Sequence, residues 1–381
     1  MGEIRKLEIN IPDDDVTDLK RRLAATRWTD QETVDDWSQG IPLAYLQDVC
    51  AYWEHGYDWR RCEARLNSFT HFKTDFDGLD IHFIHVESPE PDATPLLITH
   101  GWPGSIIEFQ KVIEPLTDPR SYGGDPSDAF HLVCPSLPGY GFSDKPTTTG
   151  WGPQRIAEAW ATLMHRLGHD RYICQGGDWG AVVSSCIAEQ DPDHCMGIHL
   201  NMVTAPPTDE TLGDLTEAEK SALATMEWYE LWDRGYGRQQ CTRPQTLGYG
   251  LADSPVGQAA WILEKFHRWT DCDGHPENVL TRDELLDNVM LYWLTATGTS
   301  SARLYWETQT PPEVDIRVPV AASIFPAEMY RPSRRWCEAH YKSLAYYNLT
   351  EKGGHFAAFE QPEIFVDEVR AAVRAIHAFT G

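Results

Sequence analysis

Short apolar runs alternate with helical segments through the middle of the chain. The apolar runs have the length and composition of buried parallel strands, and they lie at 95–99, 131–134, 172–174 and 196–202. Helical patterns fill 106–116, 153–167 and 181–188, and strand patterns return at 318–325 and 344–349 before a last helix. Strands and helices that alternate in this order predict an α/β fold with a doubly wound, mostly parallel sheet.

The first part of the chain follows a different pattern. Partial alternation from Ile4 to Ile11 predicts a strand, and helical spacing predicts one helix from Asp13 and another from Pro42 to Tyr57. A hairpin follows, with strands at 71–76 and 79–86 around an Asp77-Gly78 turn. We therefore predict that residues 1–92 form an N-terminal extension that leads into the first hairpin of the sheet. Its many aromatic residues predict that it packs on another layer.

Helical patterns replace strands between residues 204 and 312. The segments 216–234, 255–268 and 282–297 carry most of this region's tryptophans. A helical insertion between two sheet strands is expected to cover the carboxyl ends of the strands, where open α/β sheets bind ligands. The expected division is a catalytic core at 93–203 and 313–381 with a helical cap at 204–312.

Charge and composition narrow the class of protein. A formal net charge of −26 argues against nucleic acid or an anionic membrane as partner. No run of about 18 apolar residues is present, and the N-terminus lacks the apolar segment of a signal peptide. Nine scattered cysteines without a CxxC pair fit reduced thiols better than disulfides or a zinc site. We expect a cytoplasmic protein with no metal and no cofactor.

The stretch Gln175-Gly176-Gly177-Asp178-Trp179-Gly180 joins a predicted strand to a predicted helix. This pattern resembles the nucleophile elbow of the α/β-hydrolase fold, in which glycines flank the nucleophile because the turn is crowded. Asp178 occupies the position that serine holds in most such enzymes. A carboxylate is ionised at neutral pH and can attack a saturated, electrophilic carbon, which gives an ester that water must then hydrolyse. The simpler interpretation is a structural corner with Asp178 as a helix N-cap.

Two further catalytic positions follow from the chain order of this fold, in which the nucleophile precedes an acid and then a histidine. His355 lies in the loop Gly353-Gly354-His355, between the strand at 344–349 and the last helix. Glu328 comes just beyond the strand that ends at Phe325, so we expect it to orient His355 while His355 deprotonates water. Asp315 and Glu338 are interpreted as surface charges.

Hydrolysis of an ester on Asp178 needs backbone N–H donors for the tetrahedral oxyanion. The elbow offers the N–H of Trp179, and the loop His100–Ser105 offers that of Trp102 next to Pro103, which has no N–H. His100 is interpreted as a structural hydrogen-bonding residue. An alkoxide leaving group also needs an acid, and tyrosines of the cap are suitable donors, although spacing alone does not choose among them.

The motifs His100-Gly101-Trp102-Pro103-Gly104-Ser105, Gly176–Gly180 and Gly353–Glu360 together resemble the microsomal-type epoxide hydrolases. The N-terminal segments with Arg27-Trp28, Asp58-Trp59-Arg60 and Leu66-Asn67 resemble the N-terminal domain of the same family. The resemblance implies that Asp178 is the nucleophile, His355 the base and Glu328 its partner. It also implies that Tyr305 and Tyr236 polarise the epoxide, with Tyr229 and Tyr249 as alternatives to Tyr236. Trp102, Pro103, Trp179 and Phe356 are expected to contact the substrate.

The resemblance implies a cofactor-independent epoxide hydrolase that releases a vicinal diol. Without an N-terminal anchor, the chain resembles the soluble bacterial members, which act in xenobiotic breakdown or in natural-product pathways that include enediyne biosynthesis. The tryptophans of the cap suggest a bulky aryl or polycyclic epoxide, and a homodimer is left open. One alternative is a haloalkane dehalogenase that uses the same Asp–His pair, with the Trp179 indole holding the halide. The other is a binding protein that captures a ligand without turnover.

Overall fold

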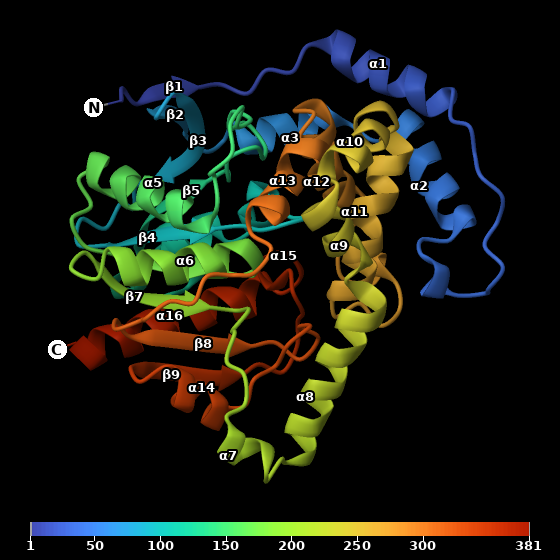
Figure 1. Cartoon of the computed structure of the whole chain (residues 1–381). Coiled ribbons are helices and arrows are strands. Elements are labelled where there is room, and N and C mark those ends of the chain that lie inside the picture. The colour runs from blue at the N-terminus through green and yellow to red at the C-terminus, as the bar shows by residue number, and fades with distance from the viewer. Residues whose placement is uncertain (1, 381) are drawn as a thin grey trace.

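A nine-stranded sheet forms the centre of the molecule in the computed structural model, which describes residues 2–380 (Figure 1). Met1 and Gly381, the outer limits of the predicted extension and core, lie outside the described residues. The strand order across the sheet is β1-β2-β3-β5-β4-β6-β7-β8-β9. The strands are β1 (Arg5–Leu7), β2 (His71–Phe76), β3 (Leu79–Val86), β4 (Thr94–Thr99), β5 (Phe130–Pro135), β6 (Tyr172–Gly176), β7 (Cys195–Leu200), β8 (Val320–Ile324) and β9 (Leu344–Leu349).

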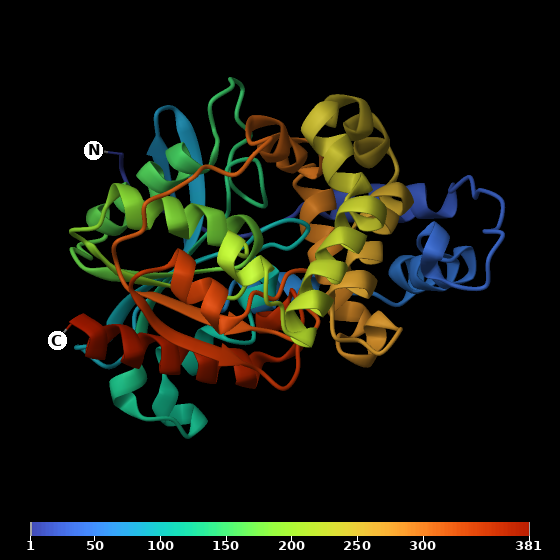
Figure 2. The same ribbon diagram turned by 60° about the horizontal axis from the view of Figure 1, so that its bottom comes forward.

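The pairing of the strands changes at β5. β1, β2, β3 and β5 pair antiparallel, whereas β5, β4, β6, β7, β8 and β9 pair parallel. Helices α5 (Pro153–Arg166) and α6 (Asp178–Gln190) lie on one face of the sheet and α16 (Pro362–Thr380) lies on the other (Figure 2). The predicted doubly wound, mostly parallel sheet is therefore confirmed.

Three predicted elements differ in the structure. The strand expected from Ile4 to Ile11 is only β1, because the backbone N–H and C=O of Ile9 bond to the side chain of Asn67 instead of a neighbouring strand. The helix expected at 106–116 is a 3-10 turn at Ile106–Phe109 followed by α4 (Ile113–Thr117). Pro115 has no N–H for the carbonyl of residue 111, so one continuous helix would lose a bond there.

The third difference is in the number of helices between β7 and β8. These inserted helices are α7 (Asp209–Leu212), α8 (Glu217–Trp228), α9 (Gly235–Thr242), α10 (Pro244–Asp253), α11 (Pro255–Trp269), α12 (Arg282–Leu294) and α13 (Gly298–Glu307), with a π-helical turn at Tyr229–Asp233 after α8. The sequence patterns missed α7, which has only four residues, as well as α9, α10 and α13. α9 and α10 each contain two glycines, which lower intrinsic helix propensity.

The N-terminal helices α1 (Asp13–Ala24), α2 (Leu43–His55) and α3 (Trp59–Leu66) pack on the inserted helices, with α1 and α2 beside α11 (Figure 1). The Trp53 indole N–H donates to the sulfur of Met290 on α12 at 3.1 Å. This contact agrees with the prediction that the aromatic extension packs on another layer. None of the helices within 2–380 is long and apolar enough to cross a membrane.

Tyr57 anchors the extension to a buried charge, and its removal should destabilise the fold. The side chain of Asp287 is fully buried and accepts hydrogen bonds from the Tyr57 hydroxyl and the Arg61 guanidinium, both at 2.6 Å. We expect Tyr57→Phe to lower the free energy of unfolding by about 1.5–3 kcal/mol, the range for hydrogen bonds to charged groups. Urea unfolding followed by tryptophan fluorescence measures the loss. The half-buried pair Tyr52–Asp283 provides the control, and a loss no larger than that of Tyr52→Phe would contradict the prediction.

Candidate active site

Asp178 lies at the crowded junction between β6 and α6. Its backbone has a φ of 49°, in the left-handed region that side chains rarely adopt. A Cβ on Gly176 would lie 2.2 Å from the backbone of Gly180, and a Cβ on Gly180 would lie 1.9 Å from the carbonyl oxygen of Thr99. Only glycine fits on either side of this turn. The N-cap of α6 is Gly177, so the simpler interpretation of Asp178 as the N-cap is wrong.

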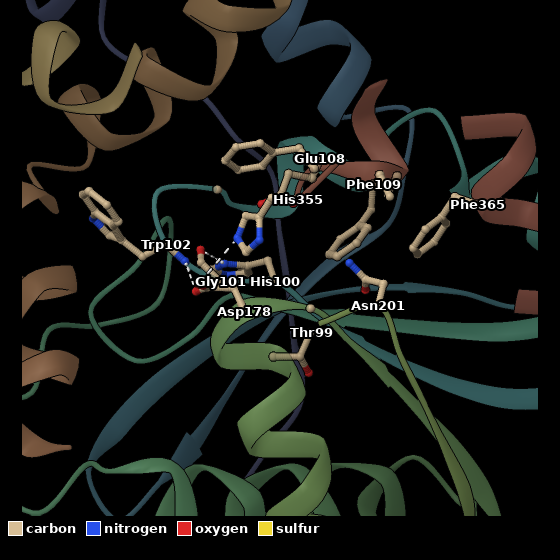
Figure 3. Close-up of a pocket in the computed structure, with 15 residues that line it drawn as sticks. Thr99, His100, Gly101, Trp102, Glu108, Phe109, Asp178, Asn201, His355 and Phe365 are labelled. Carbon is tan, nitrogen blue, oxygen red and sulfur yellow. Dashed lines mark hydrogen bonds and ion pairs between the residues drawn. The ribbon is translucent and has the colours of Figure 1, made fainter. Parts of the chain in front are cut away.

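The loop after β4 brings a backbone donor to Asp178. The N–H of Trp102 donates to Oδ1 of Asp178 at 2.7 Å (Figure 3). Helix α12 holds this loop, because the Asn288 amide donates to the Pro103 carbonyl at 2.8 Å and the Tyr292 hydroxyl donates to the Gly104 carbonyl at 2.7 Å. The Trp102 N–H is thus fixed in position before any substrate binds, as an oxyanion hole requires. Trp179 follows Asp178 directly at the start of α6, and a contribution of its own N–H stays a prediction.

His355 lies between two carboxylates, those of Asp178 and Glu328. Its Nε2 is 3.5 Å from Oδ2 of Asp178, and its Nδ1 is 3.0 Å from both carboxylate oxygens of Glu328. Burial alone would lower the pKa of His355, but the charges of Glu328 and Asp178 raise that pKa well above its usual value. His355 therefore carries a proton at neutral pH. Asp315 and Glu338 are exposed and form ion pairs with neighbouring arginines. This agrees with their interpretation as surface charges.

His100 has a structural role, as predicted. One ring nitrogen, Nδ1, bonds to the carbonyl of Gly101 at 3.0 Å, and the other, Nε2, accepts from the N–H of Leu137 at 3.2 Å. Burial lowers the pKa of His100 to about 4, so the ring is neutral and both of its nitrogens are occupied. His100 therefore ties the loop after β4 to the loop after β5.

Two tyrosines of the inserted helices meet at the indole of Trp102. Tyr236 on α9 stacks on Trp102 with ring centres 4.8 Å apart, and Tyr305 on α13 lies edge-on to Trp179 at 4.9 Å. Burial raises the pKa of both phenols well above the usual value, so both stay protonated as hydrogen-bond donors. The hydroxyl of Tyr229 is 3.0 Å from that of Tyr236, whereas Tyr249 is 70% exposed. The structure thus favours Tyr229 over Tyr249 as a neighbour of the site.

The remaining predicted contact residues surround Asp178 in different ways. Phe356 stacks on Phe266 of α11 at 4.2 Å and lines a cavity beside Asp178. The indole N–H of Trp179 is buried and has no hydrogen-bond partner within the described chain. The carbonyl of Pro103 faces Asn288. Substrate contacts by these residues and by Trp102 stay predictions.

Comparison with known proteins agrees with this geometry. The model for the epoxide hydrolase N terminus matches residues 4–109, and that for the alpha/beta hydrolase fold matches residues 94–230. A Stigmatella aurantiaca protein assigned to the epoxide hydrolases is 52% identical over 98% of this chain and 86% of its own. Epoxide hydrolase 1 of Oryctolagus cuniculus is 38% identical over 96% of this chain and 88% of its own.

The chain belongs to the epoxide hydrolase family. Solved structures support the assignment over the whole length. The epoxide hydrolase of Aspergillus niger superposes with a TM-score of 0.89 at 34% identity, covering 98% of this chain and 97% of its own. The juvenile hormone epoxide hydrolase of Bombyx mori superposes with a TM-score of 0.91 at 31% identity, covering 100% of this chain and 96% of its own.

Sequence reasoning about this epoxide hydrolase missed two polar residues beside the nucleophile. Glu108 and Asn201 line the same small cavity as Asp178 and His355 (Figure 3). One signal could have found Glu108: it is the single charged residue in the apolar run Ile106–Phe109, and all four residues of that run are buried. Asn201 gave no such signal, because it simply follows the last residue of β7.

Proposed function

We propose that this chain converts an epoxide and water to a vicinal diol through an ester on Asp178. The observation that carries the proposal is the position of the Asp178 carboxylate, between the Trp102 N–H on Oδ1 and the His355 ring near Oδ2. Oδ2 would attack an epoxide carbon, and Oδ1 would become the ester carbonyl oxygen that already faces its backbone donor. A carboxylate held in this way is a competent nucleophile for a saturated carbon.

Opening of the epoxide releases an alkoxide, which needs a proton. We propose Tyr305 and Tyr236 as the donors, because their raised pKa keeps both phenols protonated and both lie at Trp102. Tyr229 would orient Tyr236 through the bond between their hydroxyls. The inserted helices, residues 204–312, would then be a cap that supplies the acid while the core supplies the nucleophile.

Ester formation would also turn His355 into a base. The charge of Asp178 is one cause of the raised pKa of His355, and an ester carries no charge. We therefore expect that pKa to fall once Asp178 is alkylated. The proton that His355 gives up balances the one that the alkoxide takes, and His355 recovers a proton from water during hydrolysis. Glu328 holds the ring in position through both steps.

A bulky aryl or polycyclic epoxide is the substrate class that we propose. The rings of Trp102, Trp179, Tyr236 and Tyr305 form an aromatic cluster around the proposed proton donors, with ring centres 4.8–5.9 Å apart. Flat aromatic rings favour flat apolar ligands. The cytoplasmic location, the pathway and a homodimer stay predictions.

Tyr305 and Tyr236 should both contribute to protonation of the alkoxide. We expect Tyr305→Phe and Tyr236→Phe each to slow ester formation about 100-fold, the lower end for loss of a general acid, and the double variant to slow it further. Ester hydrolysis should change little, because the alkoxide has already been protonated. Single-turnover kinetics separates the two steps. Tyr172→Phe, which removes a buried hydroxyl bonded to Asp191, is the control. An equal loss in the rate of ester formation in Tyr305→Phe, Tyr236→Phe and Tyr172→Phe would contradict the prediction.

Product analysis tests the reaction class. The chain is incubated in parallel with a styrene-oxide-type epoxide and with a haloalkane, and diol and halide are measured. Diol without halide supports the proposal. Halide without diol would favour the second candidate, a haloalkane dehalogenase, for which the unpartnered indole N–H of Trp179 would hold the departing halide. Binding of the epoxide without either product would favour a ligand-binding protein.

A further inference from the structure

A small space lies beside Asp178 within the core. Its volume is about 20 Å³, and its polar walls are formed by Asp178, His355, Glu108 and Asn201 (Figure 3). A cavity needs roughly 10–15 Å³ of such volume and two or more polar partners to hold one water molecule, so this space fits a single ordered water. Tyr236 and Tyr305 are not among its lining residues.

The cavity and the tyrosines therefore approach Asp178 from different parts of the fold. The tyrosines come from the inserted helices and pack on the ring of Trp102, whereas Glu108 comes from the 3-10 turn after β4 and His355 from the loop after β9. Substrate at the tyrosines would leave this cavity free. A water held there would still be present when the ester has formed.

The side chain of Glu108 lines this cavity. Its side chain is buried, and a Cβ on Gly104 would lie 1.3 Å from its Oε1, so only glycine at position 104 leaves room for the carboxyl group. Burial raises the pKa of Glu108 to about 8, although the charge of His355 acts in the opposite direction. At neutral pH the side chain is therefore mostly a neutral carboxylic acid, with a carbonyl oxygen that can accept a hydrogen bond.

We propose that this cavity is the binding site of the hydrolytic water and that Glu108 is the residue that positions it. The inference rests on the ester mechanism proposed above. One O–H of the water points to Nε2 of His355, and the other donates to the carbonyl oxygen of Glu108. A lone pair is then left to face the carboxyl carbon of the Asp178 ester.

The step balances without any other reactant. The water oxygen bonds to the carboxyl carbon of Asp178, and His355 takes the first proton of that water. The tetrahedral intermediate collapses by breaking its bond to the alkyl oxygen, which takes the second proton of the water and leaves as the alcohol of the diol, so that Asp178 is again a carboxylate. Glu108 neither gains nor loses a proton overall. It acts through the water and is a positioning residue.

Paired substitutions at Glu108 test the proposal. Glu108→Met fills a similar volume without an acceptor, whereas Glu108→Gln retains a carbonyl oxygen. Stopped-flow tryptophan fluorescence with a styrene-oxide-type epoxide follows ester formation and ester decay. We expect Glu108→Met to slow decay about 100-fold, as for a misplaced reactant, and to leave ester formation within about 3-fold. Glu108→Gln should decay within about 10-fold of the unmodified chain.

The controls separate positioning from folding. Glu63→Met removes a buried glutamate of α3 that bonds to Ile11 and Trp59, outside the cavity, and should leave both rates unchanged. Glu108→Leu is the second variant if Glu108→Met does not fold. Equal loss of both steps in the methionine and glutamine variants, or unchanged decay in the methionine variant, would overturn the proposal. Absence of any ester in the unmodified chain and in His355→Gln would instead overturn the ester mechanism itself.

Discussion

Asp178→Asn should abolish turnover. Asparagine keeps the size of the side chain and tolerates the left-handed backbone of this position, and its amide oxygen can still accept from the N–H of Trp102. An amide has no negative charge with which to attack a saturated carbon. We expect the rate of ester formation to fall by at least about 10⁴-fold, in line with the loss of a catalytic nucleophile elsewhere. Single-turnover measurement of epoxide consumption checks this directly.

The control for Asp178→Asn is a buried aspartate outside the site. Asp128 pairs with Arg374 of α16 at 2.6 Å, and its side chain is 6% exposed, compared with 14% for that of Asp178. Asp128→Asn should therefore cost stability but leave the rate of ester formation within about 2-fold, because it touches no reacting atom. Residual turnover by Asp178→Asn close to that of the unmodified chain would mean that water attacks the epoxide without a covalent step.

His355→Gln should separate the two chemical steps. Glutamine is uncharged and cannot take a proton from water, so we expect ester hydrolysis to slow by about 10³–10⁴-fold, the upper part of the range for loss of a general base. Ester formation needs only the carboxylate and a proton donor, and should persist at a reduced rate. Stopped-flow fluorescence would show a rapid first phase and almost no second phase.

A second histidine outside the site serves as the control. His131 on β5 is half-buried, and its Nδ1 accepts from the backbone of Ser88. His131→Gln should show both phases at normal rates. A second phase at the normal rate in His355→Gln would contradict the assignment of His355 as the base.

The sequence predicted the parts of the site that follow directly from strand ends. The sequence predicts Glu328 because it follows the apolar strand that ends at Phe325, and the structure places its carboxylate 3.0 Å from Nδ1 of His355. The elbow glycines indicated a crowded turn around Asp178, which the structure confirms at Gly176 and Gly180. Both positions could be predicted because each depends on local pattern and on the chain order of one fold.

The parts that sequence could not predict depend on distant segments meeting. Tyr229, Tyr236 and Tyr305 come from different helical segments, and only packing around Trp102 decides which phenols approach Asp178. The two glycines of α9 weaken its helical pattern, and that helix carries Tyr236. The position of Glu108 beside Asp178 could not be predicted, because its apolar neighbours predict a regular helix where the structure has a 3-10 turn. The boundaries of the extension, core and cap stay predictions.

The most direct test of the account is mass spectrometry of His355→Gln after incubation with a styrene-oxide-type epoxide. The account predicts that the intact chain gains the whole mass of the epoxide and that peptide analysis places this gain on Asp178. The same chain with Asp178→Asn added should gain nothing. An unchanged mass in His355→Gln, under conditions where the unmodified chain forms diol, would contradict the covalent mechanism.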